Sequence, residues 1–277
     1  MLWSDKGRSS NVEDRRGLGG RAGLGIGGTA VLLVLSLVFG HNFFNDVGTA
    51  STATQGANGR LAPADSAREE PEVRFVSFVL DDAQATWAKI LPQQGARYHD
   101  AGLVLFRDAT DTGCGTGQTA MGPFYCSLDE KVYIDLAFYQ ELKDKFGAAG
   151  DFAQAYVIAH ELGHHVQHLL GTDTRMRRAV QGGASQNAES VKLELQADCY
   201  AGVWGHSTQQ RKVLQAGDVE EGLTAAASVG DDRIQKRTTG HVNTDSFTHG
   251  SSAQRASWFK RGFDSGDPKN CDTFAGQ

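Results

Sequence analysis

The chain of 277 residues has no excess of basic residues, since 27 lysines and arginines stand against 33 acidic residues and give a formal net charge of -6. Its basic residues form no patterned stripe either, so the composition excludes a typical nucleic-acid-binding protein. No internal repeat is apparent. The four cysteines include no C-x-x-C pair, which weakens the case for a metal site made of sulfur ligands.

Charged residues are missing altogether from residues 22–40, an uncharged run rich in Leu, Val, Gly and Ala. At about 1.5 Å per residue, a helix of this length just crosses a hydrocarbon core of about 30 Å. Arg15, Arg16 and Arg21 precede the run, and no Lys or Arg follows it until Arg60. The positive-inside rule therefore predicts a cytoplasmic segment over residues 1–21, one transmembrane helix, and a body on the other side. A cleaved signal peptide and a buried core helix are the alternatives.

No cysteine follows the apolar run closely, so lipoprotein processing is not supported. Residues 41–71 are rich in small and polar residues without an apolar period, and this predicts a flexible linker. The remaining residues, 72–277, suffice for one catalytic domain with a sizeable core. Within them, helical periodicity over residues 73–91 and short strands at 103–106 and 132–135 predict an α+β fold that is mostly helical with a small sheet.

The pentapeptide His160-Glu-Leu-Gly-His164 is an H-E-x-x-H motif. Positions four apart lie on one face of a helix, so His160 and His164 can bind one zinc ion. Glu161 lies beside that face and can act as a general base on a water molecule.

The segment 151–171 reads as one helix around the motif, with Asp151 as the expected N-cap and Gly171 as the C-cap. Two further histidines, His165 and His168, lie in the same segment. No acidic residue follows His164 in the register that would pair it with His168. We therefore expect His165 and His168 to support the ligands, or to lie at the edge of the core or on the surface.

Residues 190–202 predict a second helix, with Ser190 as a possible N-cap. Glu194 and Asp198 lie one turn apart on it. Glu194 is the expected third zinc ligand, and Asp198 is expected to accept the free ring N–H of a ligand histidine. Three protein ligands leave a fourth position open for water, as in catalytic zinc sites. A solvated acidic stripe is the alternative, but much of this helix is apolar.

Longer runs of sequence carry a family resemblance: residues 11–17, 122–126, 132–135, 152–161, 194–199, 230–235 and 248–255. Over nearly its whole length the chain resembles the bacterial putative neutral zinc metallopeptidase family, whose members carry an N-terminal membrane anchor. The ligand pattern is also similar to that of the thermolysin-like enzymes, or gluzincins. The resemblance implies a zincin-like domain, Zn²⁺ as cofactor and a peptide or protein substrate. With the anchor at residues 22–40 in the lipid bilayer, it implies a single-pass protein of the bacterial cytoplasmic membrane with an extracytoplasmic catalytic domain.

Three further positions are candidates for parts of such a site. His249 is a candidate donor to the oxyanion of a tetrahedral intermediate, with Arg255 holding it or the ligand glutamate in place. A helix N-cap and a surface cation would explain these two residues as well. Tyr200 is a weaker candidate for the donor. By analogy with thermolysin-like enzymes, residues 132–135 are the candidate edge strand that pairs with an extended substrate, and an ordinary core strand is the alternative.

Four cysteines allow three pairings. We expect Cys114–Cys126, which closes a Gly-rich loop, and Cys199–Cys271, which fixes the C-terminal region to the second ligand helix. Reduced thiols in the core and an extra metal site are the alternatives. Disulfides at these positions would fit an oxidising compartment.

The sequence thus predicts a membrane-anchored zinc metalloendopeptidase. One alternative is a non-catalytic, zinc-stabilised binding or chaperone module at the membrane surface. Such a site has no need of Glu161 and is usually closed by a fourth protein ligand. The other alternative is a zinc amidase that acts on cell-wall peptide, which the ligand set does not distinguish from a protease.

Overall fold

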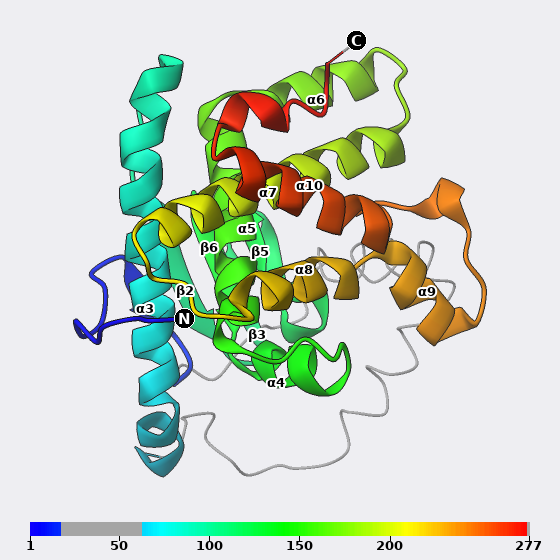
Figure 1. Cartoon of the computed structure of the whole chain (residues 1–277). Coiled ribbons are helices and arrows are strands. Elements are labelled where there is room, and N and C mark those ends of the chain that lie inside the picture. The colour runs from blue at the N-terminus through cyan, green and yellow to red at the C-terminus, as the bar shows by residue number, and fades with distance from the viewer. Residues whose placement is uncertain (18–62, 276–277) are drawn as a thin grey trace.

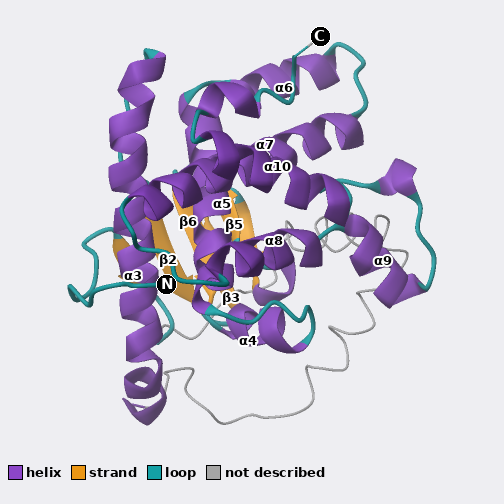
Figure 2. Ribbon diagram, viewed as in Figure 1, coloured by secondary structure: helices purple, strands orange, loops and turns teal. Residues whose placement is uncertain are grey.

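Helices pack against a small sheet in the computed structural model, which describes residues 1–17 and 63–275 (Figures 1 and 2). The helices are α3 (Pro63–Ile90), α4 (Ala137–Asp144), α5 (Asp151–Leu169), α6 (Thr172–Gln181), α7 (Gln186–Gln210), α8 (Asp218–Ser228), α9 (Asp231–Thr239) and α10 (Ser252–Ser265). The strands are β1 (Val12–Asp14), β2 (Gly102–Phe106), β3 (Ala109–Thr112), β4 (Gly115–Gln118), β5 (Phe124–Cys126) and β6 (Lys131–Asp135). The predicted helix-rich α+β fold with a small sheet is confirmed.

The main sheet has the strand order β1-β2-β6-β5. Strands β1, β2 and β6 are parallel, whereas β5 is antiparallel to β6; β3 and β4 form a separate hairpin. The strands predicted at 103–106 and 132–135 are confirmed as β2 and β6. The prediction that residues 132–135 form the edge strand is wrong, because β6 lies between β2 and β5. The two edge strands are β1 and β5, and β5 is only three residues long.

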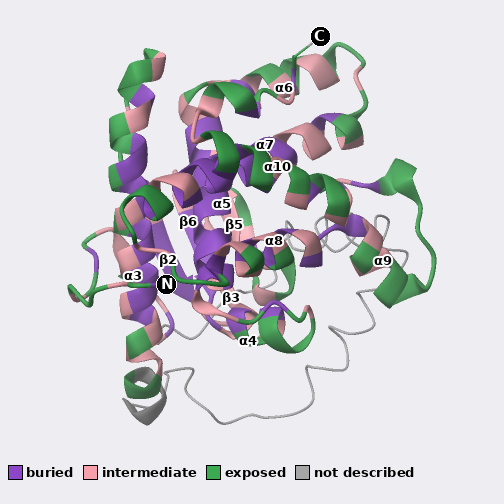
Figure 3. Cartoon of the chain, viewed as in Figure 1, coloured by how far each residue is buried: buried purple, intermediate pink, exposed green. Residues whose placement is uncertain are grey.

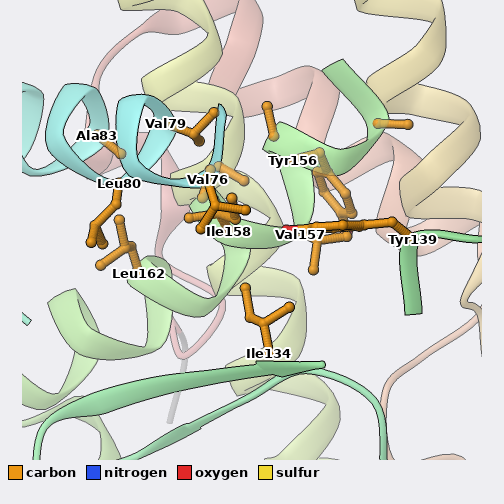
Figure 4. Close-up of a cluster of buried hydrophobic side chains, with 14 of the residues drawn as sticks. Val76, Val79, Leu80, Ala83, Ile134, Tyr139, Tyr156, Val157, Ile158 and Leu162 are labelled. Atoms are coloured by element: carbon orange, nitrogen blue, oxygen red, sulfur yellow. The ribbon is translucent and has the colours of Figure 1, made fainter. Parts of the chain in front are cut away.

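Helix α5 is the central element of the fold. It packs on β5 and β6 on one side and on α3, α7 and α8 on others (Figure 1). Its apolar side chains meet those of α3 and β6 in the main core, where the buried residues gather (Figures 3 and 4). Figure 4 labels Val76, Val79, Leu80, Ala83, Ile134, Tyr139, Tyr156, Val157, Ile158 and Leu162. Each large aliphatic side chain buried in this way contributes roughly 1.5–3 kcal/mol.

Glycines let three helices come unusually close together. A Cβ atom on Gly202 of α7 would lie 2.0 Å from the carbonyl oxygen of Phe259, and one on Gly262 of α10 would lie 1.9 Å from that of Cys199. Helices α7 and α10 therefore touch backbone to backbone. Within the H-E-x-x-H motif, a Cβ on Gly163 would lie 3.0 Å from the Cα of Ala197, so α5 and α7 are also closely packed.

The ends of the two motif helices differ from the prediction. Asp151 is the first residue of α5 and not its N-cap, since Gly150 occupies the cap position. The Asp151 carboxylate instead accepts hydrogen bonds from the α-amino group of Met1. Helix α7 begins before Ser190, and Ser185 caps it by accepting a hydrogen bond from the amide of Ala188.

The N-terminal segment, expected to be separate from the body, contributes strand β1 to the main sheet. Helix α3 begins at Pro63, so the predicted linker over residues 41–71 extends too far. The transmembrane helix predicted at residues 22–40 lies outside the described residues. Among the helices that are described, none has both the length and the apolar character needed to cross a bilayer.

Both expected disulfides are present. Cys114–Cys126 joins the loop between β3 and β4 to the end of β5, and Cys199–Cys271 joins α7 to the C-terminal region. The first bond fixes the hairpin beside the edge strand. The second lies in a smaller core cluster with Trp87 and Tyr200.

Candidate active site

Two histidines of α5 and a glutamate of α7 meet at one point. The Nε2 atom of His160 lies 3.2 Å from one carboxylate oxygen of Glu194, and the Nε2 atom of His164 lies 3.5 Å from the other. One ligand atom from each of these residues lies within 4.8 Å of the others. The structure thus brings together the three residues that the sequence predicted as zinc ligands.

The spacing of these atoms fits zinc. Ligand bonds of 2.0–2.1 Å in a tetrahedron put neighbouring ligand atoms about 3.4 Å apart. Two imidazole nitrogens and a carboxylate are also a donor set that zinc enzymes use. Burial opposes ionisation of Glu194, but His164, His160 and His249 outweigh it and hold the pKa of this carboxyl well below its usual value. Glu194 is therefore a carboxylate, the form in which it binds a metal.

Asp198 fixes the orientation of His160. It is fully buried, and its Oδ1 atom lies 2.8 Å from Nδ1 of His160, which leaves Nε2 for the metal. The same carboxylate accepts hydrogen bonds from the Tyr156 hydroxyl and from Nε and Nη2 of Arg255, at 2.8 and 2.9 Å for the latter. Arg255 is buried too and lies 3.8 Å from Glu194. Arg255 thus forms an ion pair with the ligand glutamate, as expected, but its closer partner is Asp198.

Gln167 has the corresponding place beside the second ligand histidine. Its Oε1 atom lies 2.8 Å from Nδ1 of His164, and its amide nitrogen donates to the carbonyl of Leu193 and to Gln196. It therefore orients His164 and ties α5 to α7 next to Glu194. The sequence analysis missed Gln167, although its position three residues after His164 on a helix was a usable signal.

Glu161 lines the cleft beside the ligands and is only 7% exposed. Burial raises the pKa of its carboxyl, while His160 and His164 act in the opposite direction with a smaller effect. A carboxyl group with a raised pKa can both take and return a proton near neutral pH. The position and the environment of Glu161 match the predicted role of general base.

The ligands lie in a cleft of about 1240 Å³. Phe124 and Tyr125 of β5 line one wall, and Ile234 and Gln235 of α9 belong to the lining as well. Strand β5 pairs only with β6 in the described sheet, so it is the edge strand that lines the cleft.

His249 lines the same cleft, and its side chain is half exposed. Its Nδ1 atom lies 3.2 Å from Oδ1 of Asp231. The Oδ2 atom of Asp231 accepts the three consecutive backbone N–H groups of Thr248, His249 and Gly250. Asp231 thus holds both the imidazole and its loop, a role that the sequence analysis did not assign. Burial opposes protonation of His249, but Asp231 and Glu194 outweigh it and raise the pKa of the imidazole.

Three other residues that the sequence analysis considered lie outside the ligand set. Tyr200 is buried and packs edge-on against Trp87 with ring centroids 5.2 Å apart, so it is a core residue and not a donor in the cleft. His165 is fully buried and contacts the Tyr125 hydroxyl and the carbonyl of His99. His168 lies at the edge of the cleft, 3.0 Å from Asp173.

The chain belongs to the family described as "Putative neutral zinc metallopeptidase", which it matches over residues 1–274. It is 49% identical to "Uncharacterized protein YpfJ" of Escherichia coli strain K12 over 285 aligned residues, which cover 99% of both chains. It is 44% identical to "Uncharacterized protein Rv2575" of Mycobacterium tuberculosis strain H37Rv over 206 residues, which cover 70% of this chain and 68% of that protein. No solved structure matches the chain significantly.

Proposed function

We propose that the protein is a zinc-dependent endopeptidase. The observation that carries the proposal is the meeting of His160, His164 and Glu194 beside Glu161 in an open cleft. The family to which the chain belongs supports a peptidase in the same terms. Three protein ligands, with a carboxylate base next to them, are what a catalytic zinc site needs and a structural site does not.

Zinc, when bound by these three residues, supplies Lewis-acid chemistry that acidifies a water molecule and polarises a peptide carbonyl. Glu161 takes the proton from the attacking water and passes it to the leaving amine. His249, held by Asp231, donates a hydrogen bond to the oxygen on which negative charge develops. Asp198 and Gln167 keep the Nε2 atoms of the two ligand histidines aimed at the metal position.

An extended peptide would add to the outer edge of β5, antiparallel or parallel, through backbone hydrogen bonds. The cleft is lined by β5 on one side and by α9 and the loop before α10 on the other. This arrangement supports cleavage within a chain.

We also propose that the enzyme works in an oxidising compartment outside the cytoplasm, in contact with the lipid bilayer through residues 22–40. The two disulfides, which involve all four cysteines, support the compartment. The uncharged run in the sequence supports the membrane contact.

The test compares metal content and cleavage of a peptide library for the full-length wild type and the Glu161→Gln variant. We expect one zinc per chain in both and cleavage by the wild type alone. Glu220→Gln, an exposed glutamate on α8, is the matched control and should cleave like the wild type. Cleavage retained by Glu161→Gln would exclude it as the base. Zinc in both proteins without any peptide cleavage would favour the binding module or an amidase of cell-wall peptide.

A further inference from the structure

Residues 1–17 are an integral part of the domain that carries the candidate site. Strand β1 pairs in parallel with β2, in the register Val12 to Leu103. Backbone hydrogen bonds extend beyond the strand at both ends, from the amide of Leu103 to the carbonyl of Asn11 at 2.8 Å and from that of Arg15 to the carbonyl of Leu105 at 2.7 Å. The segment completes the sheet on which α5 packs.

Side chains of this segment are also embedded in the body. Met1 lies in the main hydrophobic core, and Trp3 packs edge-on against Phe75 of α3 with ring centroids 5.4 Å apart. Arg16 is only 2% exposed and forms ion pairs with Asp14 at 2.7 Å and with Glu69 of α3 at 2.6 Å. Pulling the segment away would leave these apolar and charged groups without their partners, which is costly.

We infer that residues 1–17 and the body formed by residues 63–275 lie in the same compartment. Hydrogen bonds of 2.7–2.8 Å cannot join two parts of a chain on opposite sides of a hydrocarbon core of about 30 Å. A single crossing by residues 22–40 would separate the two parts in that way. The shared sheet therefore excludes one membrane crossing between residue 17 and residue 63. This inference does not depend on the proposed peptidase activity.

Two of the arginines that suggested a cytoplasmic N-terminus, Arg15 and Arg16, lie within the described residues and have another use in the fold. Arg15 pairs with Glu13 at 2.7 Å and donates to the carbonyl of Asp111. Arg16 is neutralised by Asp14 and Glu69. Both arginines are therefore bound by groups of the folded domain, on the same side as residues 63–275.

Cysteine labelling tests the inference on the full-length chain in bacterial cells. All four native cysteines are in disulfides, so one introduced cysteine is the unique thiol. Ser10→Cys reports on the N-terminal segment and Ala188→Cys on the body, and both positions are exposed. Spheroplasts are treated with a membrane-impermeant maleimide, before and after lysis, and labelling in denaturant gives the total of each thiol.

We expect both cysteines to react in intact spheroplasts to the same extent. Protection of both until lysis would also support a shared compartment, and would overturn only the proposed location outside the cytoplasm. Reaction of Ala188→Cys alone, with Ser10→Cys protected until lysis, would overturn the inference, as would the reverse pattern. Each of these results leaves the zinc and cleavage tests of the proposed function unaffected.

Discussion

Replacing Asp198 by asparagine is the sharpest test of how the metal position is built. The Asp198 carboxylate is fully buried and accepts hydrogen bonds from His160, Tyr156 and Arg255. Asparagine keeps the shape but removes the charge, and so leaves Arg255 buried with only Glu194, 3.8 Å away, as a counter-charge. Breaking a buried ion pair in this way costs about 3–5 kcal/mol. Loss of the group that orients a ligand histidine lowers metal affinity about 10–100-fold.

Urea unfolding of the metal-free protein measures the first effect, and titration against a competing chelator measures the second. Burial opposes ionisation of Asp198, but Arg255 and His160 outweigh it and lower its pKa. The stabilisation is therefore present at neutral pH and is lost as the pH falls through that lowered pKa. Asp264→Asn on α10 is the control, because its pair with Lys260 is exposed and contributes at most about 0.5 kcal/mol. A loss below about 1 kcal/mol for Asp198→Asn, with unchanged zinc affinity, would refute the role given to Asp198.

Three other predictions concern the groups around the metal. Gln167→Ala should weaken zinc binding about 10–100-fold, because His164 loses the group that orients its ring; an unchanged dissociation constant in a chelator titration would contradict this. His249→Ala should lower kcat about 100–1000-fold with KM and zinc content unchanged, because it removes the donor to the oxyanion. Asp231→Asn should lower kcat as well, because Asp231 holds the His249 imidazole. Steady-state kinetics in which only KM rises would reassign both residues to substrate binding. Burial opposes protonation of His160, but Asp198 and Glu194 outweigh it and raise the pKa of the imidazole to about 10. Zinc must therefore displace a proton from His160, and the affinity for zinc should rise about tenfold per pH unit below that pKa. A zinc affinity independent of pH between about pH 6 and pH 8 would contradict the last prediction.

The ligand set was predictable because each part of it is local. His160 and His164 share a helix face by their spacing, and Glu194 and Asp198 do so on the next long helix. Helical periodicity alone therefore indicates two pairs of side chains, each pointing in one direction. Neither helix alone indicates that the two faces oppose each other. This was expected only because the H-E-x-x-H motif binds a metal that needs a further ligand.

The pairing of the strands was harder to predict from the sequence. Strand β5 is only three residues long, so it has too little pattern to be recognised, and the place of β6 between β2 and β5 depends on that pairing. Strand β1 is equally short and is separated from β2 by more than eighty residues, including the apolar run that drew attention to a membrane. Asp231 was missed because the loop that it holds becomes its neighbour only when α9 and α10 meet.

Small residues explain how α5 and α7 pack closely enough for their metal ligands to meet. Gly163 lies between the ligand histidines, where any side chain would press on Ala197, one residue before Asp198. Gly202 and Gly262 bring α10 against α7, and Arg255 on α10 then reaches Asp198 across 57 residues of sequence. Each close contact involves a residue within a turn of a group that binds or orients the metal. The packing of α5, α7 and α10 therefore fixes the positions of the ligands before any ion arrives, which reduces the ordering that metal binding must impose.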